Sequence, residues 1–254
     1  MLKIRQIPAL SDNYIYLITD LETQFSACID PALSKPVLEI VKKEKIDLKY
    51  ILNTHHHYDH VGGNIELKEK IGCKIVGNKK DKERIPGIDI FVENNQSFSL
   101  GNSKCLIFEV PGHTVGHICF YFNEDNVLFC GDTLFSLGCG RLFEGTPSQM
   151  TESLFKIRSL PDDTKIYCGH EYTQSNAAFA QKLDPDDSLL QKKVDEVKKK
   201  RNKNQSTIPS ILRDEKKLNP FLKFDNIEFL EKVGVKNSTN DENFKILRVM
   251  KDNF

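Results

Sequence analysis

The sequence has no tryptophan and no net charge, because 36 Lys and Arg residues balance 36 Asp and Glu residues. A chain without excess positive charge lacks the general attraction that draws proteins to nucleic acid or to anionic membranes. Hydrophobic residues make up 39% of the chain and charged residues 28%. This composition excludes a disordered, collagenous or coiled-coil chain and is typical of a globular protein. We therefore expect neither nucleic acid nor a membrane as a partner.

Long apolar runs and paired cysteine motifs are also missing. No run of about 18 apolar residues is present, and residues 1–20 lack the basic start, apolar centre and small-residue cleavage site of a signal peptide. The 7 cysteines are odd in number and form no C-x-x-C pair, which fits neither a disulfide framework nor a zinc finger. We expect a cytoplasmic, monomeric protein with reduced thiols packed as small hydrophobic residues.

Short apolar segments alternate with amphipathic segments as far as residue 172. We expect strands over residues 14–19, 25–29, 49–53, 104–110, 117–122, 126–130 and 164–168, and helices over 36–45, 64–71 and 147–160. The later part of the chain favours helices, over 174–183, 187–203, 225–233 and 240–250. The sequence thus predicts an α+β domain over residues 1–172 and a small helical domain over 173–254.

A basic run over residues 192–203 is the feature that suggests nucleic-acid binding. Asp195 and Glu196 interrupt this run, and no aromatic side chains are interleaved with its lysines. A solvated helix face explains such a run better than a nucleic-acid surface does.

The histidines are concentrated in one place, since four of the 7 lie between His55 and His60. His55 and His57 point to the same side of an extended chain, whereas Asp59 and His60 lie on the following turn. Packing does not explain so many polar rings, because removing them from water costs free energy unless each has a partner. We expect His55 and His57 to hold one metal ion and Asp59 and His60 to hold a second.

Three further donors each follow a predicted strand and lie beside a glycine that lets the backbone turn tightly. They are His113 after Gly112, Asp132 after Gly131 and His170 after Gly169. Loops at strand ends are common places for functional sites. Five imidazoles and two carboxylates suit two divalent cations, Zn²⁺ first, with Fe or Mn as alternatives. A carboxylate has two oxygens, so Asp132 is the candidate that bridges both ions.

The other histidines and the nearby cysteines are not expected to be ligands. His56 alternates away from His55 and His57, which favours a supporting or surface position. His117 lies four residues after His113, which favours a supporting or core position. We expect Cys130, Cys139 and Cys168 to be packing residues.

Such a site predicts metal-assisted hydrolysis. Two zinc ions about 3.5–4 Å apart can share a water molecule and convert it to hydroxide near neutral pH. The hydroxide attacks an acyl or phosphoryl centre, and one ion stabilises the negative charge that develops on the substrate oxygen. In this interpretation Asp132 bridges the ions and Asp59 orients the nucleophile.

The H-x-H-x-D-H pattern, followed by separate His, Asp and His donors, resembles the metallo-β-lactamase superfamily. The resemblance implies an αββα sandwich over residues 1–172, with the site at one edge. The segments THHHYDHVGGN, GDTLFSLGCGRLFEGT and YCGHEYT are similar to those of the glyoxalase II (hydroxyacylglutathione hydrolase) family. The segments TIPSILRDEKKLNPFL and Arg248-x-x-Lys251-Asp252 resemble parts of the C-terminal helical domain of that family. This family hydrolyses S-D-lactoylglutathione to D-lactate and glutathione, the second step of methylglyoxal detoxification.

Applied to this chain, the resemblance implies specific roles. One ion would be held by His55, His57 and His113 and the other by Asp59, His60 and His170, with Asp132 bridging. Glutathione would be held by Arg141, Phe143, Tyr172, Arg248 and Lys251. Cationic side chains suit this ligand because glutathione carries two carboxylates.

One departure from the family and two other functions bear on this prediction. Family members from higher organisms carry Lys and Tyr at the positions of Arg141 and Phe143, so the missing hydroxyl predicts normal turnover with a higher KM. A mononuclear-iron dioxygenase acting on glutathione persulfide belongs to the same superfamily, but its members generally lack the helical domain. A metal-stabilised module that binds nucleic acid through residues 192–203 is the non-enzymatic alternative.

Overall fold

The structure is a computed structural model that describes residues 1–236 and 238–254. Contacts divide the chain into two compact units. The first comprises Met1–Glu109 and Thr114–Gly131, and the second comprises Val110–His113 and Asp132–Phe254. The boundary expected after residue 172 is based on strand content along the sequence and stays a prediction.

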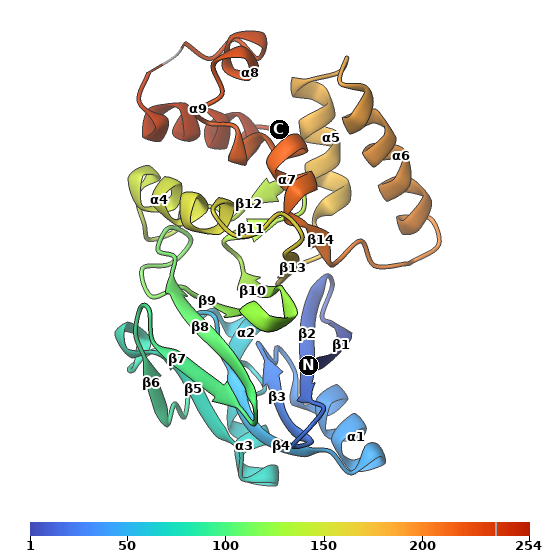
Figure 1. Ribbon diagram of the computed structural model, residues 1–254, viewed down its shortest axis with the longest axis vertical. Coiled ribbons are helices and arrows are strands. Elements are labelled where there is room, and N and C mark those ends of the chain that lie inside the picture. The colour runs from blue at the N-terminus through green and yellow to red at the C-terminus, as the bar shows by residue number, and fades with distance from the viewer. Residues whose placement is uncertain (237) are drawn as a thin grey trace. The chain divides into compact units, whose positions relative to one another are not determined.

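The first unit contains a mixed sheet with strands in the order β1-β2-β3-β4-β5-β6 (Figure 1). These strands are β1 (Leu2–Ala9), β2 (Asn13–Asp20), β3 (Phe25–Ile29), β4 (Asp47–Leu52), β5 (Lys74–Asn78) and β6 (Ile90–Val92). Pairing is antiparallel from β1 to β3 and parallel from β3 to β6. Parallel neighbours need a crossover, which α1 (Ser34–Glu44) provides after β3, and α2 (Tyr58–Val61) and α3 (Asn64–Ile71) provide after β4.

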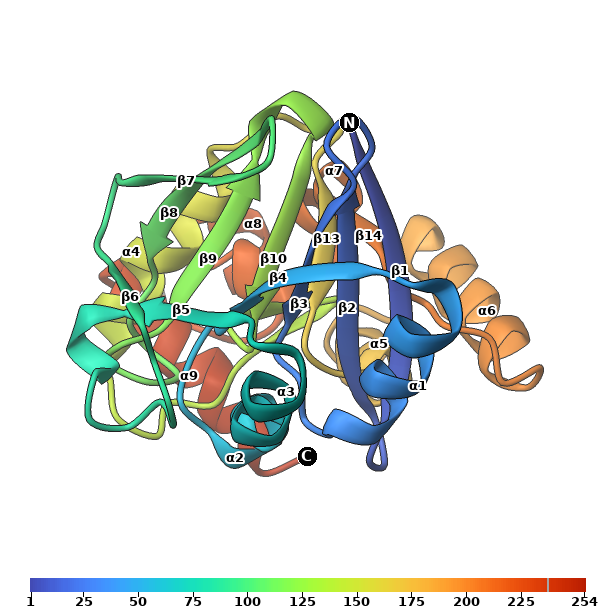
Figure 2. The same ribbon diagram turned by 90° about the horizontal axis from the view of Figure 1, so that it is seen from below.

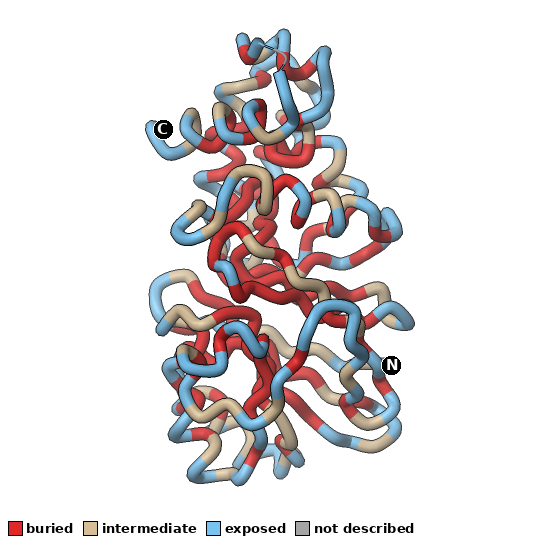
Figure 3. Tube along the Cα trace, turned by 90° about the vertical axis from the view of Figure 1, so that its left-hand side faces the viewer, coloured by how far each residue is buried: buried red, intermediate tan, exposed pale blue. Residues whose placement is uncertain are grey.

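Antiparallel strands from a second sheet complete the first unit. They run in the order β10-β9-β8-β7 and comprise β7 (Ser97–Leu100), β8 (Ser103–Glu109), β9 (Ile118–Phe122) and β10 (Val127–Gly131). Short 3₁₀ turns occur at η1 (Lys79–Asp81) and η2 (Asn123–Asp125). All residues of β9 and β10 are buried. Figure 3 shows in red where buried residues occur along the chain. Ring centroids of Tyr16 on β2 and Phe129 on β10 lie 5.4 Å apart, so the two sheets face each other within this unit.

The opposite face of the first sheet is covered by α1 and α3 (Figure 2). Val37 of α1 and Leu67 of α3 are fully buried in one apolar cluster with Ile15, Cys28 and Ile51. Burial of an aliphatic side chain of this size contributes about 1.5–3 kcal/mol. The first unit therefore supplies a helical layer and two sheet layers of the sandwich that the resemblance implies.

A buried carboxylate joins the two sheets of the first unit at one end. Asp20 at the end of β2 accepts hydrogen bonds from the Thr23 amide at 2.8 Å and the Thr23 hydroxyl at 2.7 Å. It also accepts from the Ser103 hydroxyl of β8 at 2.7 Å. Although burial raises the pKa of Asp20, these hydrogen bonds outweigh burial and hold the pKa well below its usual range.

The second unit is mostly helical. Its helices are α4 (Pro147–Arg158), α5 (Thr173–Leu183), α6 (Ser188–Arg201), α7 (Leu212–Leu218), the 3₁₀ turn η3 (Pro220–Leu222), α8 (Ile227–Lys232) and α9 (Asn240–Asp252). Its short strands form the pairs β11 (Leu134–Phe135) with β12 (Gly138–Cys139), and β13 (Lys165–Cys168) with β14 (Ser210–Ile211). Helix α5 packs beside α6, and α4 packs beside α9 (Figure 1).

The predicted elements are confirmed within a few residues, and α3 has the predicted bounds. Helix α4 begins at Pro147 as expected, and Thr146 and Gln149 form a capping box across its start. Strands β1, β5, β6 and β7 and helix α7 fall outside the segments that the sequence pattern identifies. Among the helices of the described residues, none combines the length and apolar character that crossing a bilayer requires.

Candidate metal centre

The histidine cluster begins in the connection between β4 and α2 and continues into α2. Strand β4 ends at Leu52, and the short helix α2 begins at Tyr58. Residues His55 and His57 therefore occupy the extended connection, whereas Asp59 and His60 lie within the helical turn. The sequence predicted this division between loop and turn.

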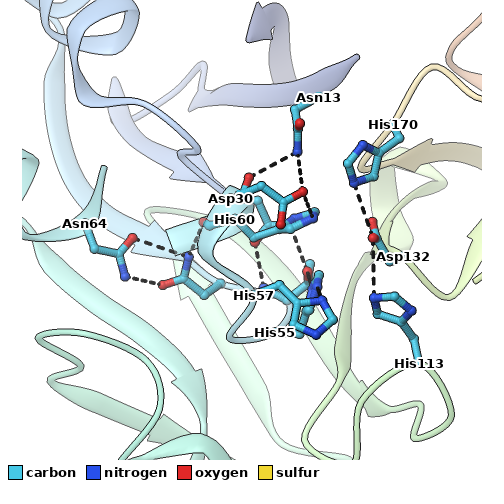
Figure 4. A network of polar contacts seen from close by, with 12 residues as sticks. Asn13, Asp30, His55, His57, His60, Asn64, His113, Asp132 and His170 are labelled. Atoms are coloured by element: carbon cyan, nitrogen blue, oxygen red, sulfur yellow. Dashed lines mark hydrogen bonds and ion pairs between the residues drawn. The ribbon is translucent and has the colours of Figure 1, made fainter. Parts of the chain in front are cut away.

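His55 and His57 direct ring nitrogens toward each other (Figure 4). The Nε2 atom of His55 lies 3.1 Å from Nδ1 of His57. Two nitrogens bound to one tetrahedral zinc ion at about 2.0–2.1 Å would be about 3.3 Å apart. The pair therefore fits one divalent ion. His55 is fully buried and its other nitrogen, Nδ1, contacts the Thr54 hydroxyl at 3.1 Å.

Asp30 orients His60, and sequence reasoning missed this residue. Its carboxylate accepts hydrogen bonds from the Thr54 amide at 2.8 Å and the Thr54 hydroxyl at 2.7 Å. The same carboxylate lies 3.1 Å from Nδ1 of His60, so that nitrogen donates to it. Nε2 of His60 then faces the Asp59 carboxylate at 3.5 Å. A carboxylate behind a histidine is the usual support of a metal ligand.

Amide side chains fix the backbone around these candidate ligands. Asn13 donates to the Asp59 carbonyl at 3.1 Å and to the Asp59 carboxylate at 2.9 Å. Asn53 donates to the His60 carbonyl at 3.0 Å, and Asn64 donates to Asn53 at 2.8 Å (Figure 4). These contacts hold α2 in place. The sequence signal was weak, because an asparagine at either end of a strand or helix is common.

The two histidines that were not expected to be ligands have supporting positions. His117 is fully buried, and its ring stacks on His55 with centroids 4.6 Å apart. His56 is half-buried and lies 3.5 Å from the fully buried carboxylate of Asp81. Asp81 is a second residue that the sequence did not single out.

The second unit brings His113, Asp132 and His170 together (Figure 4). Nε2 of His113 lies 3.5 Å and Nε2 of His170 lies 3.3 Å from the same carboxylate oxygen of Asp132. All three side chains are buried. Two imidazoles directed at one buried carboxylate oxygen is an arrangement that a shared metal environment explains.

The backbone after Asp132 fixes His113. Nδ1 of His113 donates to the Arg141 carbonyl at 2.9 Å, which leaves Nε2 directed at Asp132. Gly140 makes this approach possible, since a Cβ atom there would lie 2.0 Å from the Asp132 carbonyl oxygen and 3.1 Å from His113 Nδ1. Any side chain at position 140 would therefore displace the Asp132 backbone or the His113 ring, both of which belong to candidate metal donors.

Two aromatic residues expected to contact substrate pack on these histidines. Tyr172 stacks on His170, with centroids 4.6 Å and ring planes 5° apart. Phe143 packs edge-on against His113 with centroids 5.1 Å apart. Phe143 is 63% exposed and Tyr172 is 38% exposed, so both rings have surface available for a ligand.

The cationic residues expected to bind glutathione differ in their burial and in their contacts. Arg141, Phe143 and Arg248 line a pocket of about 300 Å³ together with Leu142, Lys245, Val249 and Asp252. Arg248 is buried, donates to the Cys139 carbonyl at 3.0 Å and pairs with Asp252 at 3.0 Å. Arg141 is exposed and lies 3.6 Å from the same Asp252.

Lys251 lies on a neighbouring part of α9 and contacts the Ser175 hydroxyl at 3.1 Å. Partial burial lowers the pKa of Lys251, with the nearby Arg248 and Arg141 charges adding to this effect. An anionic ligand would offset the neighbouring positive charges and so stabilise the charged form of Lys251.

The cysteines near the donors are buried. Burial raises the pKa of Cys139 to about 11 and raises that of Cys168 further. Thiols with such pKa values remain protonated near neutral pH. This agrees with their prediction as packing residues.

Comparisons with known proteins agree with the donor pattern. The metallo-beta-lactamase superfamily model matches residues 13–170, and the hydroxyacylglutathione hydrolase C-terminus model matches residues 171–254. A hydroxyacylglutathione hydrolase from Pelagibacter ubique is 50% identical over 253 residues, covering 100% of both chains. The ETHE1 crystal structure from Myxococcus xanthus has a TM-score of 0.70 and 24% identity, covering 96% of this chain and 89% of that one.

A further solved structure, TTHA1623 in a di-iron-bound form, is 26% identical with a TM-score of 0.57. The match covers 66% of this chain and 91% of that chain. Together with the histidine and aspartate clusters, the superfamily match shows that this protein binds divalent metal. The fold is the metallo-β-lactamase fold followed by a helical C-terminal region. With both family models matched in sequence order and a full-length relative at 50% identity, the chain belongs to the hydroxyacylglutathione hydrolase family of the metallo-β-lactamase superfamily.

Proposed function

We propose that this protein hydrolyses 2-hydroxyacyl thioesters of glutathione, with S-D-lactoylglutathione as the principal substrate. The observation that carries the proposal is the packing of Phe143 and Tyr172 on His113 and His170, which both face Asp132. Residues expected to contact substrate thus adjoin metal donors within one compact unit. The full-length relative named hydroxyacylglutathione hydrolase supports the same activity.

The metal assignment is part of the proposal. His55, His57 and His113 would hold one ion, Asp59, His60 and His170 would hold the other, and Asp132 would contact both. Imidazole and carboxylate donors suit zinc first, with iron or manganese as alternatives. The related structure named as di-iron-bound supports iron as one of these alternatives. Metal analysis of the purified protein, with an expected stoichiometry of two ions per chain, tests this assignment.

Bound divalent ions would supply an activated water nucleophile and polarise the thioester carbonyl. In the reaction the oxygen of water bonds to the acyl carbon, and the carbon–sulfur bond breaks. Glutathione leaves through sulfur and takes up a proton, while the acyl group leaves as a 2-hydroxy acid. Asp132 would help to hold the metal ions, and the approach of its carboxylate to Nε2 of His113 and of His170 supports this role.

Recognition of the glutathione portion falls to the second unit. Arg141 and Arg248 line one pocket, and guanidinium groups suit carboxylate ligands. Phe143 offers an apolar wall there, and the Tyr172 hydroxyl offers a hydrogen bond. Lys251 adds a third cation from the same helix as Arg248. These roles distinguish a glutathione thioester from other thioesters.

The other two functions have less support. The match of residues 171–254 to the hydroxyacylglutathione hydrolase C-terminus disfavours the persulfide dioxygenase. Within the basic run, Glu196 pairs with Lys193 at 3.2 Å and with Lys200 at 3.0 Å, which reduces the charge available to a phosphate backbone.

The test compares S-D-lactoylglutathione with the D-lactoyl thioester of a simple thiol, with metal content measured on the same sample. We expect a strong preference for the glutathione thioester, loss of turnover on chelation and its loss in Asp132→Ala. Arg248→Ala should abolish the preference, whereas Lys193→Ala, which removes a cation on α6, should retain it. Absence of hydrolysis by the metal-loaded protein would overturn the proposal, and oxygen consumption with glutathione persulfide would favour the dioxygenase.

A further inference from the structure

The segment between Asp132 and Arg141 is a small hairpin whose backbone is held by side chains from outside it. Strands β11 and β12 pair Leu134 with Cys139 and Phe135 with Gly138. The intervening Leu137 has a positive φ of 57°, which a non-glycine residue adopts only when its surroundings hold it. The hairpin therefore depends on its neighbours for its conformation.

Four buried polar side chains supply that support. The Leu137 amide donates to Glu215 at 2.8 Å. Asn219 donates to the Phe135 carbonyl at 3.2 Å and to the Gly138 carbonyl at 3.0 Å. Asn176 donates to the Ser136 carbonyl at 3.1 Å, and Arg248 donates to the Cys139 carbonyl at 3.0 Å. Each contact satisfies a main-chain group that burial would otherwise leave unpaired.

Glu215 and Asn219 act as one rigid support. Glu215 lies within α7 and Asn219 directly follows its last residue, and Asn219 donates to the Glu215 carboxylate at 3.1 Å. The side-chain carbonyl oxygen of Asn219 also accepts from the Phe221 amide at 3.0 Å. Asn219 is fully buried and Glu215 is 1% exposed. Buried networks with all members bonded are rigid.

The residue that follows the hairpin forms a hydrogen bond with a proposed metal donor, His113. The Gly140 amide donates to the Thr133 carbonyl at 3.2 Å. The next residue, Arg141, presents the carbonyl that accepts from His113 Nδ1 at 2.9 Å. Because a carbonyl only accepts, this contact fixes the Nδ1–H tautomer of His113 and leaves Nε2 for a metal.

We propose that Glu215 and Asn219 are positioning residues, which hold the β11–β12 hairpin so that the Arg141 carbonyl keeps His113 in the tautomer and orientation that bind metal. The inference rests on the proposed role of His113 as a ligand. It gives α7 and the following turn a function in the metal centre, although neither residue touches a donor side chain.

The first test replaces Asn219 with alanine. In the metal-free protein, ¹⁵N NMR of the His113 ring should change from the single Nδ1–H form to a mixture of tautomers. Chelator competition with zinc should show binding weakened about tenfold, the lower end of the effect of losing a ligand's supporting partner. An unchanged His113 tautomer together with an unchanged zinc affinity would overturn the inference.

Asn243→Ala is the matched control. Asn243 is also fully buried and donates to a main-chain carbonyl, that of Phe224, at 3.0 Å. Both variants should lose similar thermal stability, but Asn243→Ala should leave the His113 tautomer and zinc affinity unchanged. Equal effects of the two variants on zinc affinity would mean that general destabilisation explains the result, and the inference would fail.

Glu215→Gln provides a second variant that preserves shape. Its amide oxygen can still accept from the Leu137 amide, so zinc affinity should lie between those of the wild type and Glu215→Ala. A loss in Glu215→Gln as large as that in Glu215→Ala would contradict the hydrogen-bond argument. The His113 tautomer in Asn219→Ala is measured in metal-free protein, so that result does not depend on the proposed hydrolysis. Absence of metal binding by the wild type would instead refute the proposed function.

Discussion

The phenol ring of Tyr172 lies parallel to the imidazole of His170, with centroids 4.6 Å and planes 5° apart. The stack links a proposed metal ligand directly to a proposed substrate contact. Phe135 packs edge-on against both rings, with centroids 6.0 Å from His170 and 5.1 Å from Tyr172. His170 is therefore oriented by aromatic packing as well as by Asp132.

This arrangement predicts that the ring and the hydroxyl of Tyr172 have separable effects. Tyr172→Phe keeps the stacked ring, so metal affinity should be unchanged while KM for the glutathione thioester rises. Tyr172→Ala removes a contact worth about 0.5–1.5 kcal/mol, so metal affinity should also fall, by about 2- to 10-fold. Zinc titration and steady-state kinetics on both variants measure the two effects. Equal metal affinities in the two variants would show that the stack does not position His170.

Phe143 offers a gain-of-affinity prediction. Its exposed ring lines the pocket that contains Arg141 and Arg248, so an added hydroxyl is tolerated sterically. A restored substrate hydrogen bond contributes about 0.5–1.5 kcal/mol, and Phe143→Tyr should lower KM by about 2- to 10-fold without changing kcat. Phe91→Tyr, another exposed ring, is the control. An unchanged KM in Phe143→Tyr means that this contact plays no part in binding.

Asp30 should control metal affinity through His60. In Asp30→Asn an amide NH₂ can face His60 Nδ1 in place of a carboxylate oxygen, which favours the wrong histidine tautomer. We expect metal affinity to fall by about 10- to 100-fold, measured by chelator competition. The matched control is Asp20→Asn, since Asp20 is also buried within the same unit but bonds to Thr23 and Ser103. If Asp30→Asn binds metal as the wild type does, the supporting role of Asp30 is wrong.

Asp20 should contribute to resistance against acid. Its hydrogen bonds hold the folded-state pKa below the usual value of 3.8 despite burial. The stabilisation is therefore complete above that unfolded-state value and is lost as pH falls from it through the lower folded-state pKa. Denaturant titrations should show that Asp20→Asn is less stable at neutral pH and that its deficit shrinks in strong acid. A deficit that stays constant between pH 7 and pH 2 would contradict this account.

The sequence by itself determined the donor types and most of the elements. The spacing of His55, His57, Asp59 and His60 predicted their division between a loop and a turn, because side-chain direction follows local backbone geometry. Helix α4 was predicted to begin at Pro147 for a similarly local reason, because proline favours the first turn of a helix, and the structure confirms this start. The family resemblance was carried by contiguous motifs, which need no knowledge of distant contacts.

Only the tertiary structure decided which distant side chains support the donors. Asp30 precedes a proline and gave no local sign that it binds Thr54 and His60. Strand β1 was missed because its pairing with β2, rather than its own pattern, establishes it. Helix α7 was missed because it is short, and its importance comes from Glu215 meeting a hairpin 78 residues away along the chain. Such contacts depend on the packing of the whole fold, and local sequence periodicity carries no information about them.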